Sequence, residues 1–388
     1  MLNVKTLNNI SDKGLDRLPS DLFTVGDDVD NPDAILLRSF QMHDMELPTN
    51  LKAVGRAGAG VNNIPVEKLS MLGIPVFNAP GANANAVKEL VIAGLLLAAR
   101  NICQAWEYTC NLEGDDAELH KQVEAGKKKF AGFELPGRTI GVVGLGAIGR
   151  YVANAAVDLG MKVIGFDPGI TVEGAWQLSA DVKKAGSIEE LLRNVDFVTF
   201  HVPLMDATRD MINADTIKIM RDGATILNFA RDGIVNDEAV VGAIKEGKIH
   251  AYVCDFPSNT LKGHDRVIAL PHLGASTGEA EENCAVMVAE QVKEFLLHGN
   301  IKNSVNFPEV NVPQETEYRV VIANENVPKM LGSISTVMAD AGLNIHDMVN
   351  KSRGDLAYTV VDCDSEISDA VIDKLSGIEG VLSVRAIQ

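Results

Sequence analysis

A glycine-rich turn between an apolar strand and a helical segment constrains the fold of this chain more than any other feature. The predicted strand Thr139–Val143 leads into Gly144–Gly149, which follows the pattern G-x-G-x-x-G, and the helical run Arg150–Leu159 comes next. Asp167 ends the following strand. Glycines at this spacing let backbone N–H groups and the helix N-terminus approach a pyrophosphate, while the carboxylate accepts hydrogen bonds from ribose hydroxyls. The segment therefore predicts a dinucleotide-binding βαβ unit.

Asp167 also indicates which dinucleotide binds. Its charge would repel the 2′-phosphate of NADP, and no arginine stands immediately beside it in the sequence, so we expect NAD. The expected pyrophosphate contacts are Gly144, Gly146, Ala147, Ile148 and Gly149.

Short apolar runs alternate with helical patterns over most of the chain, which indicates parallel sheets. We expect two doubly wound α/β domains: a discontinuous substrate-binding domain of residues 1–97, completed by about residues 278–303, and a Rossmann NAD domain of residues 98–277. One long helix, Lys88–Cys110, is expected to connect them. The other predicted elements are strands at Ala34–Leu37, Lys52–Ala57, Lys162–Phe166, Phe197–His201, Thr225–Phe229 and Ile249–Cys254, and a helix at Thr277–His298 that returns to the first domain.

The pattern changes after Asn303–Pro313, a segment with the composition of a linker. Residues 314–388 then show βαββαβ order, which predicts a ferredoxin-like domain. Its expected elements are Tyr318–Ala323, Lys329–Ala341, Asn344–Val349, Leu356–Cys363, Ile367–Ser376 and Val381–Ala386.

Composition excludes several classes of function. The formal net charge of −18 opposes binding to nucleic acid or to an anionic membrane. The five cysteines are scattered without a CxxC pair, so neither a disulfide framework nor a metal site is expected. No secretory signal begins the sequence and no window approaches the roughly 18 apolar residues of a membrane span. A cytoplasmic location is therefore expected.

Two further segments carry a resemblance to a known family. Asn228–Asn236 is similar to the N-x-x-R-G-x-x-V-D segment of the D-2-hydroxyacid dehydrogenases, and Pro271–Thr277 is similar to their P-H-x-x-x-x-T segment. The glycine turn near residue 140, behind an α/β unit, also resembles that family. The resemblance implies that Arg231 binds and polarises the substrate carboxylate and carbonyl, and that His272 is the general acid/base. It adds expected cofactor contacts at Val202, Pro203, Phe229, Asp255, His272 and Gly274.

One departure concerns the carboxylate that the family places against the histidine, in a D-V-F-x-x-E pattern. Here Asp255 stands one place later than the family's aspartate, and Asn259 occupies the place of the glutamate. The usual histidine–carboxylate pair therefore cannot be assembled from this region in the standard way. We expect activity to remain, with an altered pH profile.

The segment Gly55–Ile64 resembles the substrate loop of family members that oxidise D-3-phosphoglycerate. This resemblance implies that the backbone at Gly58, Ala59 and Gly60 binds the carboxylate and that Arg56 faces the phosphate. The alternative is that Arg56 is a surface residue at the end of a strand. Asn83 lies in a segment similar to the family's hinge and is an expected substrate contact.

The C-terminal βαββαβ unit resembles an ACT domain, a fold that binds amino acids at paired interfaces. Asn324, Asn326 and Asn344 match the positions that bind serine in regulated members of the family. Asn324 stands where histidine is common, and Lys329 stands where glycine usually follows the proline. The alternative is a dimerisation module without a ligand.

Together these features predict NAD-dependent oxidation of D-3-phosphoglycerate in serine synthesis. Reduction of hydroxypyruvate or glyoxylate, or turnover of another D-2-hydroxyacid, is the alternative within enzymes. A protein that senses NADH and binds partners is the alternative outside them. The family implies a homodimer or larger homo-oligomer, built on the Lys88–Cys110 region.

Overall fold

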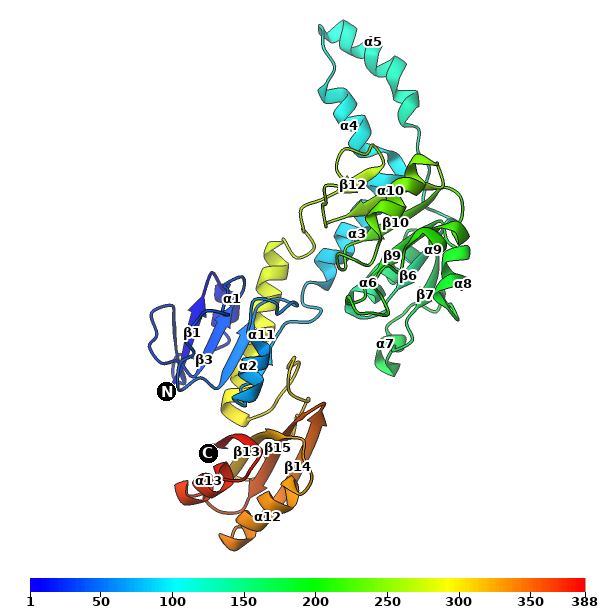
Figure 1. Ribbon diagram of the computed structural model, residues 1–388. Helices are drawn as coiled ribbons and strands as arrows, with labels where there is room; N and C mark the ends of the chain where they lie inside the picture. The colour runs from blue at the N-terminus through cyan, green and yellow to red at the C-terminus, as the bar shows by residue number, and fades with distance from the viewer. Residues whose placement is uncertain (388) are drawn as a thin grey trace. The chain divides into compact units, whose positions relative to one another are not determined.

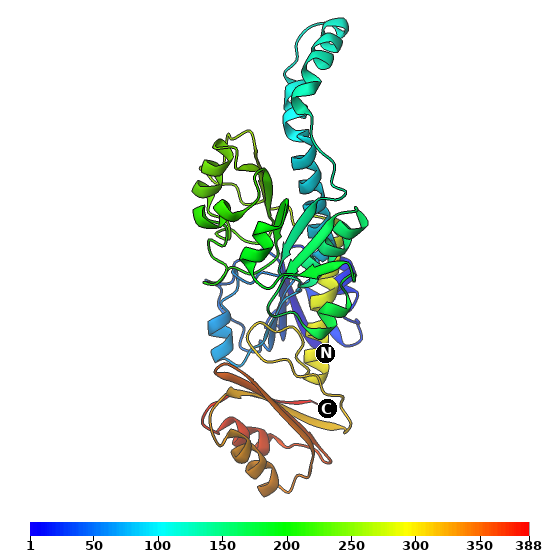
Figure 2. The same ribbon diagram turned by 90° about the vertical axis from the view of Figure 1, so that its right-hand side faces the viewer.

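The computed structural model describes residues 1–387, which fall into two compact units. The first unit contains Met1–Asn83 and the chain from Gly278 onward, and the second contains Ala84–Thr277 (Figures 1 and 2). The last residue of the predicted C-terminal domain, Gln388, lies outside the described residues. Within residues 1–387, no helix is both long and apolar enough to cross a membrane.

The first unit begins with a five-stranded parallel sheet of order β2-β1-β3-β4-β5. Helix α11 (Gly278–His298) packs along this sheet, as Figure 1 shows in yellow. A Cβ at Gly55 would lie 2.7 Å from Val288 of α11, so glycine allows the helix to approach β4 closely. The elements are β1 (Leu2–Leu7), α1 (Asp12–Leu15), β2 (Phe23–Gly26), β3 (Ala34–Leu37), β4 (Ala53–Arg56), α2 (Val66–Met71) and β5 (Val76–Phe77).

The second unit is a seven-stranded parallel sheet of order β12-β11-β10-β9-β6-β7-β8. This order is the doubly wound topology that the glycine turn predicts, and all five predicted strands are confirmed. Two short strands at the sheet edges, β8 and β12, were not predicted. The strands are β6 (Thr139–Val143), β7 (Lys162–Phe166), β8 (Val182–Lys184), β9 (Phe197–Phe200), β10 (Ala224–Asn228), β11 (Ile249–Cys254) and β12 (Val267–Ala269). The helices between them are α6 (Ala147–Asp158), α7 (Val172–Trp176), α8 (Ile188–Arg193), α9 (Ala214–Ile219) and α10 (Asp237–Lys245).

The prediction of one continuous helix over Lys88–Cys110 is wrong. The chain forms α3 (Ala84–Arg100) and α4 (Ile102–Cys110), separated by Asn101 in the left-handed region with φ 51°. Asparagine tolerates this conformation, and the buried Asn101 amide donates to the carbonyls of Phe130 and Ala131. Helix α4, α5 (Asp116–Gly126) and the short 3-10 helix η1 (Lys127–Phe130) form an arm that extends from the second unit (Figure 2).

The C-terminal part has the predicted βαββαβ order, with an antiparallel four-stranded sheet of order β14-β15-β13-β16. This strand order is that of a ferredoxin-like fold. The two helices cover one face of the sheet, where Met330, Ile334 and Leu375 pack against Val320 and Val361. The elements are β13 (Tyr318–Glu325), α12 (Met330–Asp340), β14 (Ile345–Arg353), β15 (Leu356–Cys363), α13 (Asp369–Ser376) and β16 (Val381–Ile387).

The other face of this sheet joins the hydrophobic core of the first unit, where Val321 and Tyr358 share one cluster with Phe295 of α11. The segment Asn303–Pro313, which has the composition of a linker, is packed into the same core. Phe307 is 1% exposed, and Asn306 bonds the backbone at both Ile74 and Val76. The C-terminal domain is therefore fixed to the five-stranded sheet of the first unit rather than tethered to it.

Candidate active site

The predicted functional segments of the second unit follow neighbouring strands at one edge of the sheet. In sheet order, His272 comes after β12, Asp255 after β11, Arg231 after β10, Val202 after β9, the glycine turn after β6 and Asp167 after β7. The carboxyl ends of parallel strands meet at the same edge, which is where open α/β sheets bind ligands. The structure therefore brings all of these segments to one edge.

The glycine turn has the geometry that a dinucleotide requires. Gly144 has φ 85°, and a Cβ there would lie 2.5 Å from the carbonyl oxygen of His201. A Cβ at Gly149 would collide with the carbonyl of Gly144, so this glycine lets α6 pack against the turn. A Cβ at Gly146 meets nothing within 4 Å, which leaves space in front of the N-terminus of α6. Open space beside the N–H groups of Ala147 and Ile148 fits a pyrophosphate.

The side chains around the turn divide into those that face this edge and those that do not. Asp167 accepts hydrogen bonds from the backbone N–H groups of Leu145 and Gly169, at 2.8 Å each, which holds its carboxylate beside the turn. Val202 packs over Gly144, and the Thr208 hydroxyl bonds the carbonyl of Pro203 at 2.7 Å. In contrast, the Phe229 ring is buried against Gly94 of α3. Any cofactor contact at Phe229 would therefore have to use its backbone.

His201 was not singled out from the sequence, although its carbonyl lies against Gly144. Its Nε2 lies 3.1 Å from the Thr199 hydroxyl, and its Nδ1 is buried without a partner in residues 1–387. Burial lowers the pKa of His201 to about 3. This histidine is therefore neutral at physiological pH and unsuited to acid–base work.

The loop that carries Arg231 is shaped by Asn228, the last residue of β10. The Asn228 amide donates to the carbonyl of Arg231 at 2.9 Å and accepts from the N–H of Ala230 at 3.2 Å. Arg231 itself is exposed and donates only to the carbonyl of Ala230 among the bonds resolved in residues 1–387. Most of the five donors of its guanidinium are thus available for an anion.

His272 is exposed on the loop after β12, and its surroundings were only partly predicted. The Phe256 ring meets the imidazole edge-on, with ring centroids 5.1 Å apart, and the His272 N–H donates to the carbonyl of Asp255 at 3.1 Å. Asn259, which holds the place of the family's glutamate, is exposed. Asp255 instead is 1% exposed, and Gly274 is buried next to it.

In the first unit, the predicted substrate loop follows β4. The loop is held from β5, since the Asn78 amide donates to the carbonyl of Ala59 at 2.6 Å and the N–H of Ala79 donates to Gly58. The Arg56 guanidinium folds over the loop, so that a side chain at Gly58 would displace it, and Gly60 lies just beyond. Asn83, within the segment similar to the family's hinge, has a buried Oδ1 without a hydrogen-bond partner in residues 1–387.

Arg38, at the end of β3, is a residue that sequence reasoning missed. The Nε of Arg56 donates to its carbonyl at 3.1 Å, and the buried Asn63 amide fixes the same carbonyl. Burial raises the pKa of the Cys284 thiol on α11, and the positive charges of Arg56 and Arg38 both oppose this rise. A second cation therefore lies beside Arg56, and only the adjacency of β3 and β4 could have revealed it.

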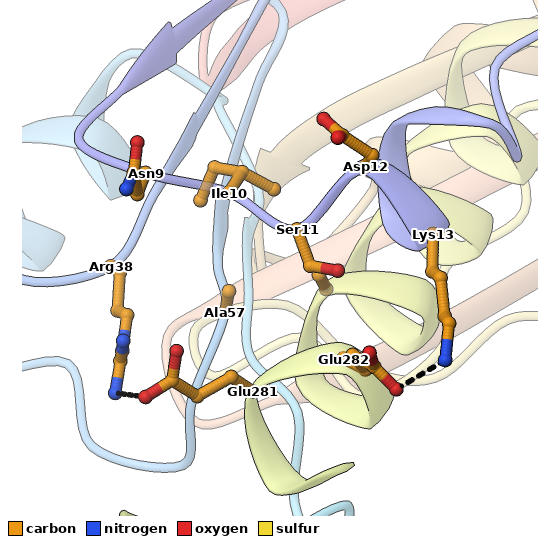
Figure 3. Close-up of a pocket in the computed structure, with 10 residues that line it drawn as sticks. Asn9, Ile10, Ser11, Asp12, Lys13, Arg38, Ala57, Glu281 and Glu282 are labelled. Carbon is orange, nitrogen blue, oxygen red and sulfur yellow. Dashed lines mark hydrogen bonds and ion pairs between the residues drawn. The ribbon is translucent and has the colours of Figure 1, made fainter. Parts of the chain in front are cut away.

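A cavity of about 500 Å³ opens at this edge of the first sheet (Figure 3). Arg38 bonds Glu281 at 2.7 Å on one side of it, and Lys13 bonds Glu282 at 2.6 Å on the other. The other lining residues are Asn9, Ile10, Ser11, Asp12, Ala57 and Ala285. An anion entering here would compete with the two glutamates for the cations.

The predicted effector residues are only partly together. Asn324 and Asn326 line a cavity of about 200 Å³ near the β14–β15 turn. Asn324 is buried and bonds Thr359 and the carbonyl of Glu325. Asn344 lies at the other end of the sheet, where its amide bonds Asp364 at 2.5 Å. Strand β15 separates the two ends by roughly 23 Å.

Residues 93–274 match the model of the NAD-binding domain of D-isomer specific 2-hydroxyacid dehydrogenases. No group of three or more His, Cys, Asp or Glu side chains that could hold a metal occurs in residues 1–387. The matched region contains the glycine turn, Asp167, Arg231 and His272.

Several curated relatives carry the name D-3-phosphoglycerate dehydrogenase. The protein of Methanocaldococcus jannaschii is 39% identical over 82% of this chain, and the protein of Haemophilus influenzae is 33% identical over 88%. This chain spans 58% of the first relative's length and 83% of the second's.

Solved structures show the same fold. The NAD⁺-bound 3-phosphoglycerate dehydrogenase of Entamoeba histolytica is 25% identical, with a TM-score of 0.60 over 79% of this chain and 98% of its own. The D-mandelate dehydrogenase of Rhodotorula graminis, at 24% identity, has a TM-score of 0.67 over 80% of this chain and 99% of its own, which is a likeness of fold. From the matched NAD-binding domain and the identity to the Haemophilus influenzae protein over most of both chains, it follows that this chain belongs to the D-2-hydroxyacid dehydrogenase family.

Proposed function

We propose that the protein oxidises D-3-phosphoglycerate to 3-phosphohydroxypyruvate with NAD, a step toward L-serine. The observation that supports the dehydrogenase activity is that the site segments follow consecutive strands at one edge of the sheet of the second unit. Two arginines at neighbouring strand ends of the first unit support a phosphorylated substrate. The named relatives support the same choice.

Oxidation of a 2-hydroxyacid needs a bound hydride acceptor and a base for the hydroxyl proton, and residues of the second unit are suited to provide both. Bound NAD would supply the hydride acceptor. The N–H groups at the start of α6 and the Asp167 carboxylate are suited to hold its pyrophosphate and ribose. The Arg231 guanidinium would bind the substrate carboxylate, and a neutral His272 imidazole would take the hydroxyl proton as the carbonyl forms.

Arg56 and Arg38 would determine the choice of substrate. A phosphate dianion suits guanidinium groups, because each offers a planar fork of donors and keeps its charge. The backbone of Gly58, Ala59 and Gly60 would hold the carboxylate end, with Asn83 as a further contact. An unphosphorylated acid would offer these arginines no phosphate to bind.

The test compares kcat/KM for NAD reduction with D-3-phosphoglycerate and with D-glycerate. We expect phosphoglycerate to be preferred, and Arg56→Ala to weaken it by about 2 kcal/mol, or roughly 30-fold, more than glycerate. Arg17→Ala is the matched control, since this half-exposed arginine of the same unit pairs only weakly with Glu290 at 3.7 Å. An equal loss for both substrates in Arg56→Ala would give Arg56 a structural role instead.

The same assay separates the alternatives. Faster reduction of hydroxypyruvate or glyoxylate, with no selective effect of Arg56→Ala, would identify a reductase. Binding of NADH without turnover of any 2-hydroxyacid would favour a protein that senses NADH.

We also propose that serine binds the C-terminal domain as a feedback effector. The cavity beside Asn326 supports this, and the distance between Asn326 and Asn344 implies that a ligand touching both lies between two copies of the chain. Calorimetry with millimolar serine should detect binding that Asn326→Ala and Asn344→Ala each weaken, whereas the exposed Asn111→Ala in the other unit should not. Absence of binding to the wild type would make the domain a structural module.

The arm formed by α4 and α5 supports the proposal of a dimer. Ile102 and Trp106 on α4 are 44% and 69% exposed, and no residue of this helix is buried. Apolar side chains grouped on a projecting element are typical of an interface. Light scattering should show a dimer, and a monomer at micromolar concentration would contradict the proposal.

The five free thiols suit the reducing cytoplasm, which we propose as the compartment.

A further inference from the structure

The loop proposed to bind substrate after β4 is supported by a very short strand. Strand β5 contains only Val76–Phe77 and is the last strand in the order of its sheet. The next residue, Asn78, donates to the carbonyl of Ala59 at 2.6 Å, and the N–H of Ala79 donates to that of Gly58 at 3.0 Å. Two residues are fewer than a strand usually has, so one neighbouring strand can supply few ladder bonds to them. The position of the loop therefore depends on what covers the outer side of β5.

The outer side of β5 is covered by a segment that is distant in the sequence. Ser304 forms an antiparallel bridge with Phe77, and the N–H of Val305 donates to the carbonyl of Val76 at 2.9 Å. Asn306, at the end of this segment, lies 230 residues after Val76. Residues 304–306 thus pair with β5 as a short additional strand would. The edge of the sheet beside the substrate loop is completed from the other end of the first unit.

The side chains of this segment also bond the backbone of β5. The Oδ1 of Asn306 accepts from the N–H of Val76 at 2.9 Å, and its amide donates to the carbonyl of Ile74 at 3.0 Å. The Ser304 hydroxyl lies 3.2 Å from the carbonyl of Val76 and 2.9 Å from Oδ1 of Asn306. Both side chains are buried, so water competes little for these bonds. They fix the backbone that leads directly into Asn78.

The C-terminal domain contacts both this segment and the chain before β5. Arg353, the last residue of β14, donates to the carbonyl of Ser304 at 2.8 Å. Ser383 on β16 donates to the carbonyl of Gly73 at 3.1 Å. Gly73 has φ 69°, and a Cβ there would lie 2.5 Å from the Ser383 hydroxyl, so glycine permits this contact. Two strands of the C-terminal domain thus hold the surroundings of β5.

We propose that Ser304 and Asn306 are positioning residues for the substrate loop, and that Arg353 makes the C-terminal domain part of its support. The proposal rests on the proposed function, in which the backbone of Gly58–Gly60 binds the substrate carboxylate. Backbone groups bind an anion well only when they are held in the productive geometry. Because every 2-hydroxyacid carries this carboxylate, loss of the support should weaken phosphorylated and unphosphorylated acids alike.

The kinetic test compares KM and kcat for D-3-phosphoglycerate and D-glycerate in Arg353→Met. This change removes the guanidinium of an exposed side chain, so the fold should be kept. With one hydrogen bond lost, KM for both acids should rise roughly threefold to tenfold, while kcat and KM for NAD stay close to the wild type.

Two further variants control this test. Arg353→Lys keeps a donor and should restore much of the wild-type KM. Lys351→Met removes the same charge from an exposed position on the same strand and should change nothing. An unchanged KM for both acids in Arg353→Met would overturn the proposal, and so would an equal rise in KM for NAD.

Hydrogen exchange tests the positioning without substrate or cofactor. In Ser304→Ala, peptides covering residues 55–64 and 74–80 should exchange roughly fivefold faster, whereas a peptide from β1 should not change. Arg353→Met should show the same pattern, and Ser352→Ala, at the exposed neighbouring position, should match the wild type. Unchanged exchange at the loop in both Ser304→Ala and Arg353→Met, or an equal increase in β1, would overturn the proposal.

The two readouts separate this proposal from the proposed function. If the wild type does not prefer phosphoglycerate, the choice of substrate is wrong, yet exchange at the loop still reports whether residues 304–306 position it. If the wild type prefers phosphoglycerate and the loop is unaffected in the variants, only the positioning role is wrong.

Discussion

Two regions of this molecule bury an aspartate almost completely and treat its charge in opposite ways. In the C-terminal sheet, Asp362 is 2% exposed and forms a two-pronged ion pair with Arg319, at 2.6 and 2.8 Å. Arg319 is 0% exposed, and its remaining donors bond the carbonyls of His298, Val312 and Pro313. Every group there has a partner.

At the end of β11, Asp255 is as deeply buried as Asp362 but has no such partner, and one of its oxygens bonds nothing. This difference in pairing indicates a different role for each region. A fully paired network fixes the C-terminal sheet against the end of α11, whereas burial raises the pKa of the incompletely paired carboxylate. Burial alone would not have distinguished the two.

The largest effect is expected from breaking the paired site. Asp362→Asn leaves the charge of Arg319 buried without its counterion, so it should destabilise the C-terminal domain by about 3–5 kcal/mol. Hydrogen exchange of peptides from β13 and β15 would measure the loss locally. Glu282→Gln, which breaks the exposed pair with Lys13, should cost less than about 1 kcal/mol. A loss of similar size in both variants would show that the buried ion pair stabilises the protein no more than the exposed one.

A smaller effect of opposite sign is expected at the unpaired site. Because burial raises the pKa of Asp255, the folded state binds its proton more tightly than the unfolded state. The stability that this proton confers is present below the ordinary pKa of aspartate and is lost as the pH rises through the raised value. Asp255→Asn should therefore match the wild type in thermal stability at acid pH and exceed it slightly at pH 7. A lower Tm than the wild type at pH 7 would show that the charge is well paired after all.

Much of the fold could be predicted because the relevant signals are local. Continuous apolar runs defined β6, β7 and β11 to the residue, and the glycine turn defined the topology around them. The break at Asn101 could not be predicted, since its left-handed conformation depends on carbonyls of Phe130 and Ala131 that are distant in sequence. The edge strands β8 and β12 were missed because three residues give no period to recognise.

In the candidate site too, some residues can be recognised from local sequence and others cannot. Arg231, His272 and the glycine turn lie in motifs that can be recognised in the sequence. Arg38 lies in no such motif, because its importance comes from the pairing of β3 with β4. The burial of Asp255 against Gly274 brings together segments that follow different strands, which no spacing in the sequence encodes.

The end of helix α11 bears on how modular this chain is. Arg385 bonds the carbonyls of Phe295 and Leu296, Arg319 bonds that of His298, and the Tyr358 hydroxyl bonds that of Gly299. The last turn of α11, which packs on the five-stranded sheet, is thus completed by side chains encoded in the C-terminal domain. A gene fusion or deletion with its junction in the segment 303–313 would separate the helix from its own cap. The evolutionary unit that can be exchanged is therefore the C-terminal domain together with the end of α11, and chimeras should place their junction within that helix.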